Sequence, residues 1–192
     1  MLSHLKSKKI ILASKSPRRQ ELLKGLDIQF EIKTKEVDES YPLTMKPEQV
    51  PVFLAEKKAD AFVDLLEKDT ILITSDTIVI QGKNILEKPN SIEEGKAMIR
   101  KLSGQVHTVV TGVCIRTLEK SINFSDETRV LFTDLTDDEI DYYMKNYQPF
   151  DKAGSYGVQE WIGYVGIEKL DGSYYNVMGL PVHKVYTALK TF

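Results

Sequence analysis

An apolar strand that leads directly into a capped helix constrains the fold of this chain more than any other segment. Residues 10–12 (Ile-Ile-Leu) form a short apolar run typical of a buried strand, and Ser16 and Pro17 stand where a helix N-cap and first turn are expected. The first turn of a helix has unpaired backbone N–H groups and the positive end of the helix dipole. The segment therefore predicts a helix-flanked sheet with a place where an anion can bind.

Two arginines in the first turn of this predicted helix strengthen that interpretation. Arg18 and Arg19 carry guanidinium groups that stay protonated and match the geometry of phosphate oxygens. The alternative is an ordinary capped helix whose basic turn is simply solvated. For a bare Ser-Pro-Arg-Arg segment that alternative is the better interpretation, and the position directly after a strand narrows the difference.

Length, composition and charge limit the classes of protein that this chain can belong to. The 192 residues suit a single domain, residues 1–192, with an ordinary 42% apolar and 28% charged content. A net charge of -2 disfavours nucleic acid as a partner and leaves a nucleotide as the better ligand. Cys114 stands alone, the first nine residues lack a signal peptide's apolar run, and no apolar stretch is long enough to span a membrane. We expect a cytoplasmic protein without a membrane contact.

Helical and strand patterns alternate along the rest of the chain, which predicts an α/β or mixed α+β fold. The expected elements are a helix over residues 50–66, a strand over 71–80, a helix from Ser91 to near Gly104, a hairpin of 106–116 and 122–132, a helix capped by Thr136 and Glu139, strands at 164–170 and 174–177 around the turn Asp171-Gly172, and a last helix from Pro181 to Leu189.

Asp76, in Ser75-Asp76-Thr77, is the second chemical candidate. A carboxylate inside an otherwise apolar strand is costly to bury without a partner or a task. Asp76 could bind a divalent cation, or orient and deprotonate a water molecule. The alternative, equally open from the sequence, is that the strand ends at Thr74 and Asp76 lies in a turn.

Further charged residues could complete such a site. Residues 36–39 (Glu-Val-Asp-Glu) offer the second acidic group that metal-assisted hydrolysis of an anion requires, although a solvated loop would read the same way. Lys58 precedes the Asp76 strand and Lys88 follows it, so both could reach a shared phosphate, although most lysines are only surface charges.

The glycine-rich loop over residues 151–159 contributes an amide at its end. Gln159 could bind a base edge, because an amide supplies both a donor and an acceptor, although a well-ordered turn explains the glycines equally well. His4, His107 and His183 lack the spacing of metal ligands, and neither a catalytic Ser-His-Asp set nor a Walker A loop is present. We expect His107 to be a strand residue with a hydrogen-bonded ring.

Taken in order, these segments resemble the Maf-type nucleoside triphosphate pyrophosphatases over nearly the whole chain. The landmarks are ASKSPRR (13–19), VDE (37–39), LAEKKA (54–59), SDT (75–77), EKP (87–89), SGQVHTVVTGV (103–113), DKAGSYGVQ (151–159) and NVMGLP (176–181). The form of the last two resembles the branch that acts on dTTP and UTP rather than the branch associated with methylated GTP.

The resemblance implies roles for individual residues. It makes Asp76 the catalytic proton acceptor, with Lys58 and Lys88 as catalytic lysines. It implies that Asp38 and Asp76 hold a divalent metal cofactor, Mg²⁺ or Mn²⁺, and that Glu39 could also contribute. The implied substrate-binding residues are Ser14, Arg18, Arg19, Thr77, Asp151 and Gln159, with Arg18, Thr77 and Gln159 selecting the base.

The resemblance further implies a Maf/ITPase-like fold, with a central mixed sheet, two lobes around a deep nucleotide-binding cleft, and a homodimer. The expected reaction is metal-dependent hydrolysis of dTTP and UTP, with modified pyrimidine nucleotides as further substrates, to the nucleoside monophosphate and pyrophosphate. The alternative is a non-catalytic, nucleotide-binding regulator of septum formation. Three positions depart from the family pattern: Ser75 replaces a usual alanine, and Glu87 and Glu160 stand where glycine is common.

Overall fold

The computed structural model describes residues 2–192, and strands and helices alternate along them. The strands are β1 (Lys9–Leu12), β2 (Glu31–Ile32), β3 (Thr70–Gln81), β4 (Asn84–Leu86), β5 (Val106–Arg116), β6 (Ser121–Phe132) and β7 (Ile167–Asp171). The α-helices are α1 (Pro17–Lys24), α2 (Val50–Asp60), α3 (Ile92–Leu102), α4 (Asp137–Tyr147), α5 (Trp161–Gly166), α6 (Tyr174–Val177) and α7 (Val182–Leu189). Short 3-10 helices occupy Ser3–Ser7, Pro47–Gln49, Val63–Leu65 and Ala153–Ser155.

The strands form one mixed sheet, as predicted. The strand order is β2-β1-β3-β5-β6-β7, and β4 pairs with β3 outside this path. β1 pairs in parallel with both β2 and β3, so that Leu12 lies opposite Ile32 on one side and Ile73 on the other. β4 is antiparallel to β3, and β7 is antiparallel to β6. The neighbouring strands β5 and β6 are joined by residues 117–120, a connection so short that only an antiparallel hairpin accommodates it.

The described residues divide into two compact units, which agrees with the two predicted lobes. Unit 1 holds the residues through Asp76 together with Thr111–Asp126 and Gly179–Phe192, and unit 2 holds Thr77–Val110 and Glu127–Met178. Strands β3, β5 and β6 each contribute residues to both units.

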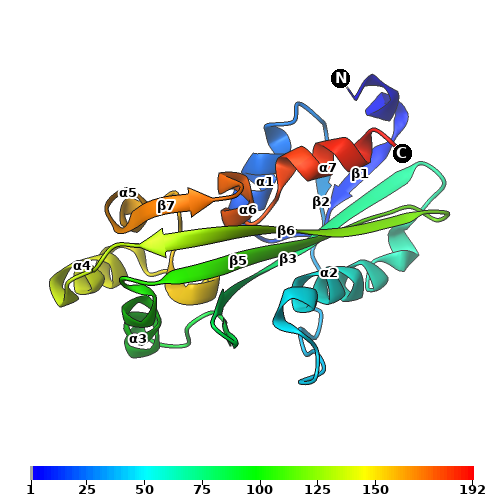
Figure 1. Ribbon diagram of the computed structural model, residues 1–192. Helices are drawn as coiled ribbons and strands as arrows, with labels where there is room; N and C mark the ends of the chain where they lie inside the picture. The colour runs from blue at the N-terminus through cyan, green and yellow to red at the C-terminus, as the bar shows by residue number, and fades with distance from the viewer. Residues whose placement is uncertain (1) are drawn as a thin grey trace. The chain divides into compact units, whose positions relative to one another are not determined.

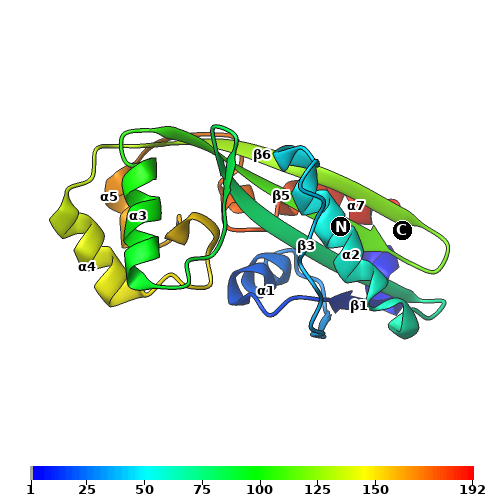
Figure 2. The same ribbon diagram turned by 90° about the horizontal axis from the view of Figure 1, so that it is seen from below.

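Unit 1 is layered around the N-terminal strands. Helices α1 and α7 lie on one face of its strands and α2 lies on the other (Figure 1, Figure 2). The α2 face packs an apolar cluster drawn from β1, α2, the residues just after α2, β3 and β5: Ile11, Ala55, Ala59, Phe62, Leu66, Leu72 and Cys114. Burial of Cys114 in a strand confirms the sequence prediction, and burial raises the pKa of its thiol.

Unit 2 has its own core, in which α3, α4 and α5 pack against the remaining strand residues. Its fully buried members include Ile99, Leu102, Val130, Ile140 and Tyr143. Thr136 and Glu139 form the predicted capping box of α4. The expected box at α3 is half formed: Ser91 accepts from the Glu94 N–H, whereas the Glu94 carboxylate accepts from the Asn90 N–H.

Two predictions from the sequence are wrong near the C-terminus. Residues 174–177 form α6 rather than a strand, because the Ser173 side chain caps the segment by accepting from the Asn176 N–H. Residues 161–166 form α5, so the strand expected over 164–170 is shortened to β7.

The helix expected over residues 50–66 is shorter than predicted. It ends as an α-helix at Asp60, and the 3-10 turn Val63–Leu65 follows it.

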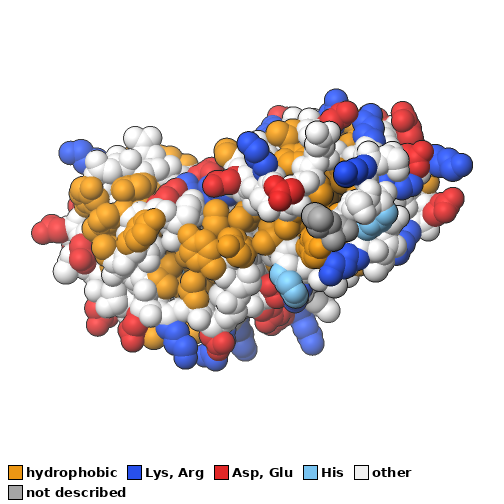
Figure 3. All heavy atoms as spheres, turned by 90° about the horizontal axis from the view of Figure 1, so that it is seen from above, with side chains coloured by type: hydrophobic (Ala, Val, Ile, Leu, Met, Phe, Trp, Pro, Cys, Tyr) orange, Lys and Arg blue, Asp and Glu red, His pale blue; other side chains and the backbone are white. Residues whose placement is uncertain are grey.

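Unit 2 also carries apolar side chains on its surface. They gather over α5, β7 and α6 in the view of Figure 3. The exposed apolar or aromatic residues of these elements include Tyr164, Val165, Tyr174 and Tyr175. A contiguous apolar surface is typical of a contact with another molecule. None of the helices within residues 2–192 combines the length and apolar character needed to cross a membrane.

Candidate active site

The turn between β1 and α1 is built as the sequence predicts. Ser16 caps α1 by accepting from the Arg19 N–H at 3.5 Å, and Pro17 occupies the first turn. Ser14 is buried, its hydroxyl accepts from the Ser16 N–H at 3.2 Å, and its carbonyl accepts from Gln20 Nε2 at 3.3 Å. These bonds fix the path of the backbone where the strand becomes a helix.

Arg19 joins three separate segments of unit 1. Its Nε donates to the Gly179 carbonyl and its Nη1 donates to the Ser75 carbonyl, each at 2.9 Å. Desolvation by burial lowers the pKa of the guanidinium, and the nearby Asp76 carboxylate acts in the opposite direction. Arg19 thus connects α1 to β3 and to the segment before α7 through two hydrogen bonds. The neighbouring Arg18 is half-buried.

Asp76 lies in the middle of β3, which continues to Gln81, so the turn alternative is wrong. Side chains alternate across a strand, and Thr74 and Asp76 both point to the α2 face. Thr74 Oγ1 donates to the Ala55 carbonyl at 2.6 Å, and Asp76, only 8% exposed, accepts from Lys58 on α2. The buried Ser75 hydroxyl has no hydrogen-bond partner within residues 2–192.

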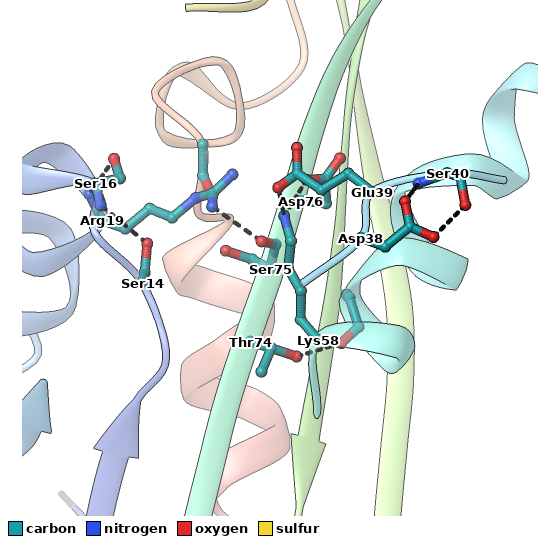
Figure 4. A network of polar contacts seen from close by, with 12 residues as sticks. Ser14, Ser16, Arg19, Asp38, Glu39, Ser40, Lys58, Thr74, Ser75 and Asp76 are labelled. Atoms are coloured by element: carbon teal, nitrogen blue, oxygen red, sulfur yellow. Dashed lines mark hydrogen bonds and ion pairs between the residues drawn. The ribbon is translucent and has the colours of Figure 1, made fainter. Parts of the chain in front are cut away.

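Lys58 stands between two carboxylates. Its Nζ lies 2.6 Å from Asp76 Oδ1 and 2.8 Å from Glu39 Oε1 (Figure 4). The Lys58 and Asp76 side chains are 15% and 12% exposed, whereas that of Glu39 is 49% exposed. A buried strand, a helix and the segment before that helix therefore bring one cation and two anions to one place.

Asp38, one residue before Glu39, is held elsewhere. Its carboxylate accepts from Lys57 Nζ at 2.8 Å, from the Ser40 N–H at 3.0 Å and from the Ser40 hydroxyl at 2.5 Å. The hydrogen bond from Lys57, followed by those from Ser40, holds the pKa of this carboxyl well below its usual range. Asp38 turns toward Ser40 in Figure 4, while Glu39 turns toward Asp76 and Lys58.

The remaining predicted residues lie in unit 2. Thr77 directly follows Asp76 in β3, and Lys88 is exposed in the segment after β4. Asp151 accepts from Lys152 Nζ at 2.8 Å. Gln159 is half-buried, and its Oε1 atom is fully buried with no hydrogen-bond partner among the described residues. The six other predicted residues lie in unit 1: Ser14, Arg18, Arg19, Asp38, Lys58 and Asp76.

The contacts of the glycine-rich loop over residues 151–159 are not predicted from the sequence. The Lys152 side chain is only 9% exposed and also binds Glu160 Oε1 at 3.0 Å, while the buried Tyr143 hydroxyl donates to Glu160 Oε2. The sequence offers one indication of these contacts, because Lys152 and Glu160 stand at the two ends of the glycine-rich run. This spacing alone does not show that the two side chains meet. Within residues 2–192 no three His, Cys, Asp or Glu side chains form a group that could hold a metal.

Comparisons with known proteins agree with these features. The model of the family described as "Maf-like protein" matches residues 9–192. A dTTP/UTP pyrophosphatase of Parabacteroides distasonis is 51% identical over 193 residues, covering 100% of both chains. One from Porphyromonas gingivalis is 53% identical over 195 residues, covering 100% of this chain and 98% of its own.

A solved structure of a nucleoside-triphosphatase/dITP/XTP pyrophosphatase from Mycobacterium abscessus aligns with 65% of this chain and 74% of its own, at 14% identity and a TM-score of 0.38, a likeness too slight to bear on the fold. The family match and the full-length relatives are far stronger. This chain belongs to the Maf-like protein family.

Proposed function

We propose that this chain is a nucleoside triphosphate pyrophosphatase that hydrolyses dTTP and UTP to the nucleoside monophosphate and pyrophosphate. Relatives that are about half identical over their full length carry the name dTTP/UTP pyrophosphatase. The structural observation that carries the proposal is the placement of Asp76 in the middle of β3, with Lys58 Nζ at 2.6 Å from its carboxylate.

In this reaction a water molecule attacks the α-phosphorus, the bond from that phosphorus to the bridging oxygen breaks, and pyrophosphate leaves. We assign Asp76 as the group that accepts a proton from the attacking water. Lys58 holds the Asp76 carboxylate in one orientation by pairing with it. Arg19 fixes the backbone on the other side, through the Ser75 carbonyl.

Negative charge on the triphosphate must be balanced, because such transfers depend mainly on positioning and electrostatics. We assign this role to Arg18, Lys88 and the backbone N–H groups at the start of α1. Ser14 contributes by holding the turn that presents those groups. Thr77, Asp151 and Gln159 stay predicted contacts of the substrate, with Thr77, Gln159 and Arg18 predicted to select the base.

The residues around Lys58 fit a divalent cation. Mg²⁺ is commonly held by one or two carboxylates together with substrate phosphates and water, and Asp76 and Glu39 offer two carboxylates that meet at one ammonium group. Asp76 and Glu39 would hold the ion. When bound, Mg²⁺ or Mn²⁺ would supply positive charge to the triphosphate oxygens. Asp38 stays a predicted ligand with weaker support, because Ser40 and Lys57 engage both of its carboxylate oxygens away from Lys58.

The proposal is tested by pyrophosphate release from a panel of nucleoside triphosphates, with Mg²⁺, with Mn²⁺ and with EDTA. We expect metal-dependent release that is fastest with dTTP and UTP. Release only from purine or methylated nucleotides would keep the reaction type and overturn the assigned substrates. Binding without release from any nucleotide would favour the regulatory alternative.

The predicted homodimer, the cytoplasmic location and the absence of nucleic-acid binding are part of the same proposal. Light scattering after size-exclusion chromatography measures the mass of the particle directly. A mass twice that of the 21.9 kDa chain is expected, and a mass equal to one chain would overturn the dimer.

A further inference from the structure

Glu160 in unit 2 has both of its carboxylate oxygens engaged by neighbouring side chains. Oε1 lies 3.0 Å from Lys152 Nζ, and Oε2 accepts from the Tyr143 hydroxyl. The Glu160 side chain is 18% exposed and that of Lys152 is 9% exposed, whereas Asp151, the other partner of Lys152, is 58% exposed. Water therefore solvates the Asp151 charge, while Lys152 balances the charge on Glu160.

Tyr143 connects this ion pair to the backbone of the loop. Its side chain comes from α4 and is fully buried, and its oxygen accepts from the Gly157 N–H at 3.0 Å while its hydrogen goes to Glu160. Burial and the Glu160 carboxylate raise the pKa of this phenol, so it stays a donor. The chain of contacts runs from the Gly157 N–H through Tyr143 to Glu160 and Lys152.

The loop closes tightly on the same residues. The Glu160 N–H donates to the Gly157 carbonyl at 3.0 Å, which makes residues 157–160 a turn. A Cβ atom at Gly157 would lie 2.8 Å from Glu160 Cδ and 3.0 Å from Gln159 Nε2. The Gln159 amide and the Glu160 carboxylate therefore both lie against the Gly157 backbone, and only glycine leaves them this space.

Glu160 is placed where its side chain could cap a helix, but it does not do so. It stands at the N-cap of α5, yet its side chain makes no capping hydrogen bond. Gln159, next to it, has a buried Oε1 atom with no hydrogen-bond partner within the described residues, and a buried acceptor without a partner is costly. The carboxylate thus supports a turn that holds a side-chain amide in an unfavourable position, which is typical of a binding site.

We propose that Glu160 is a positioning residue that, together with Lys152 and Tyr143, holds the Gln159 amide in place and so sets the base selectivity of the enzyme. This inference rests on the proposed function, in which Gln159 contacts the base. Glu160 touches no reacting atom, so its loss changes substrate discrimination rather than the chemical step.

Two variants and one control test the geometry without any substrate. Tyr143→Phe removes the acceptor of the Gly157 N–H, and Glu160→Gln keeps the shape of the side chain and removes its charge. Hydrogen exchange by NMR should show the Gly157 amide exchanging about tenfold faster or more in Tyr143→Phe, with a smaller increase in Glu160→Gln. Thr128→Val removes two other hydrogen bonds of unit 2, one to the Ser173 carbonyl and one from the Asn176 amide, and should leave the Gly157 amide unchanged.

Kinetics then test the consequence. For Glu160→Gln we expect the ratio of kcat/KM for dTTP to that for dCTP to fall about tenfold, through KM, with kcat for dTTP within about twofold of the wild type. In a Gln159→Ala background the same substitution should change the ratio no further, because its effect passes through the amide. Thr128→Val should leave the ratio unchanged.

The possible failures are distinguishable. If the wild type releases no pyrophosphate from any nucleotide, the proposed function fails, while the exchange experiment still tests the loop. Unchanged exchange at Gly157 in Tyr143→Phe overturns the proposed geometry. A kcat loss shared equally by all nucleotides, or a selectivity change that persists in the Gln159→Ala background, overturns the positioning role.

Discussion

Lys58 and Asp76 form an ion pair inside unit 1, with Nζ 2.6 Å from Oδ1 and both side chains less than one-sixth exposed. Such pairs contribute little to stability on balance, because the attraction between the charges is offset by the loss of their hydration. The pair is therefore better explained by what it holds ready, a carboxylate of fixed orientation in the middle of a strand, than by any gain in folding free energy.

Asp76→Asn should lower kcat for dTTP by about a hundredfold to ten-thousandfold, the range ascribed to a positioned general base. Asparagine keeps the size of the side chain and accepts from Lys58, but it cannot take a proton from water. Binding of a non-hydrolysable dTTP analogue, measured by calorimetry, should be largely retained.

Asp64→Asn serves as the control for this experiment, because Asp64 pairs with Lys35 in an exposed ion pair of the same unit. Its turnover should match the wild type. A folded Asp76→Asn enzyme with near-normal turnover would remove Asp76 from the mechanism.

Lys58→Met should destabilise the protein by about 3–5 kcal/mol, because the buried Asp76 carboxylate then loses its direct ion-pair partner. Adding Asp76→Asn should restore part of the loss, since the double variant leaves no unpaired charge at that strand position. Urea unfolding of the two single variants and the double variant measures the coupling between them.

The exposed pair between Lys8 and Asp69 gives the comparison. Lys8→Met should cost no more than about 1 kcal/mol, as is usual for surface ion pairs. Equal losses at Lys8 and Lys58 would mean that the site is more hydrated than its burial indicates.

Ser75→Ala should leave the free energy of unfolding unchanged or raise it by about 1 kcal/mol, because the buried Ser75 hydroxyl lacks a hydrogen-bond partner within the described residues. Thr74→Val, at the preceding position of the strand, should instead lower it by about 0.5–1.5 kcal/mol, because it removes the buried hydrogen bond from Thr74 Oγ1 to the Ala55 carbonyl. Thermal and urea unfolding of both variants check the contrast, which a clear loss of stability in Ser75→Ala would contradict.

Local signals explain what could be predicted from the sequence. Ser16 and Pro17 specify the start of α1 through bonds within one turn, and the start was predicted correctly. The segment 174–177 was predicted wrongly because its tyrosines and valine favour strands, while the cap supplied by Ser173 and the hydrogen bonds of the Asn176 amide to Val109 and Thr128 decide otherwise.

The candidate site was predictable by residue type but not by pairing. Asp76 and Lys58 were both named from the sequence, yet their contact depends on α2 packing against β3. Which of Asp38 and Glu39 reaches Lys58 depends on the path of the segment before α2. Adjacent side chains of that segment point in different directions, so a shift by one residue would exchange their partners. In the sequence Glu160 stands out only as a departure from the family pattern, because its partner Tyr143 lies 17 residues earlier, on α4.

His107 should make the stability of the protein depend on pH. Its ring is buried, and Nε2 lies 2.7 Å from the Tyr156 hydroxyl. Nδ1 has no hydrogen-bond partner within residues 2–192, so only one of the two ring nitrogens is hydrogen-bonded as expected. Desolvation by burial lowers the pKa of His107 to about 4. In the unfolded chain the pKa of histidine is about 6.5.

The unfolded state therefore binds more protons than the folded state between about pH 6.5 and pH 4, and the free energy of unfolding falls as the pH falls through this window. The loss attributable to His107 should total about 3 kcal/mol and be absent above about pH 7. His107→Gln should flatten the curve in this window, whatever its absolute stability, whereas His183→Gln, at an exposed position of α7, should leave its shape unchanged. Urea unfolding at half-unit pH steps separates these outcomes, and parallel curves for wild type and His107→Gln would show that burial does not lower the pKa of the ring.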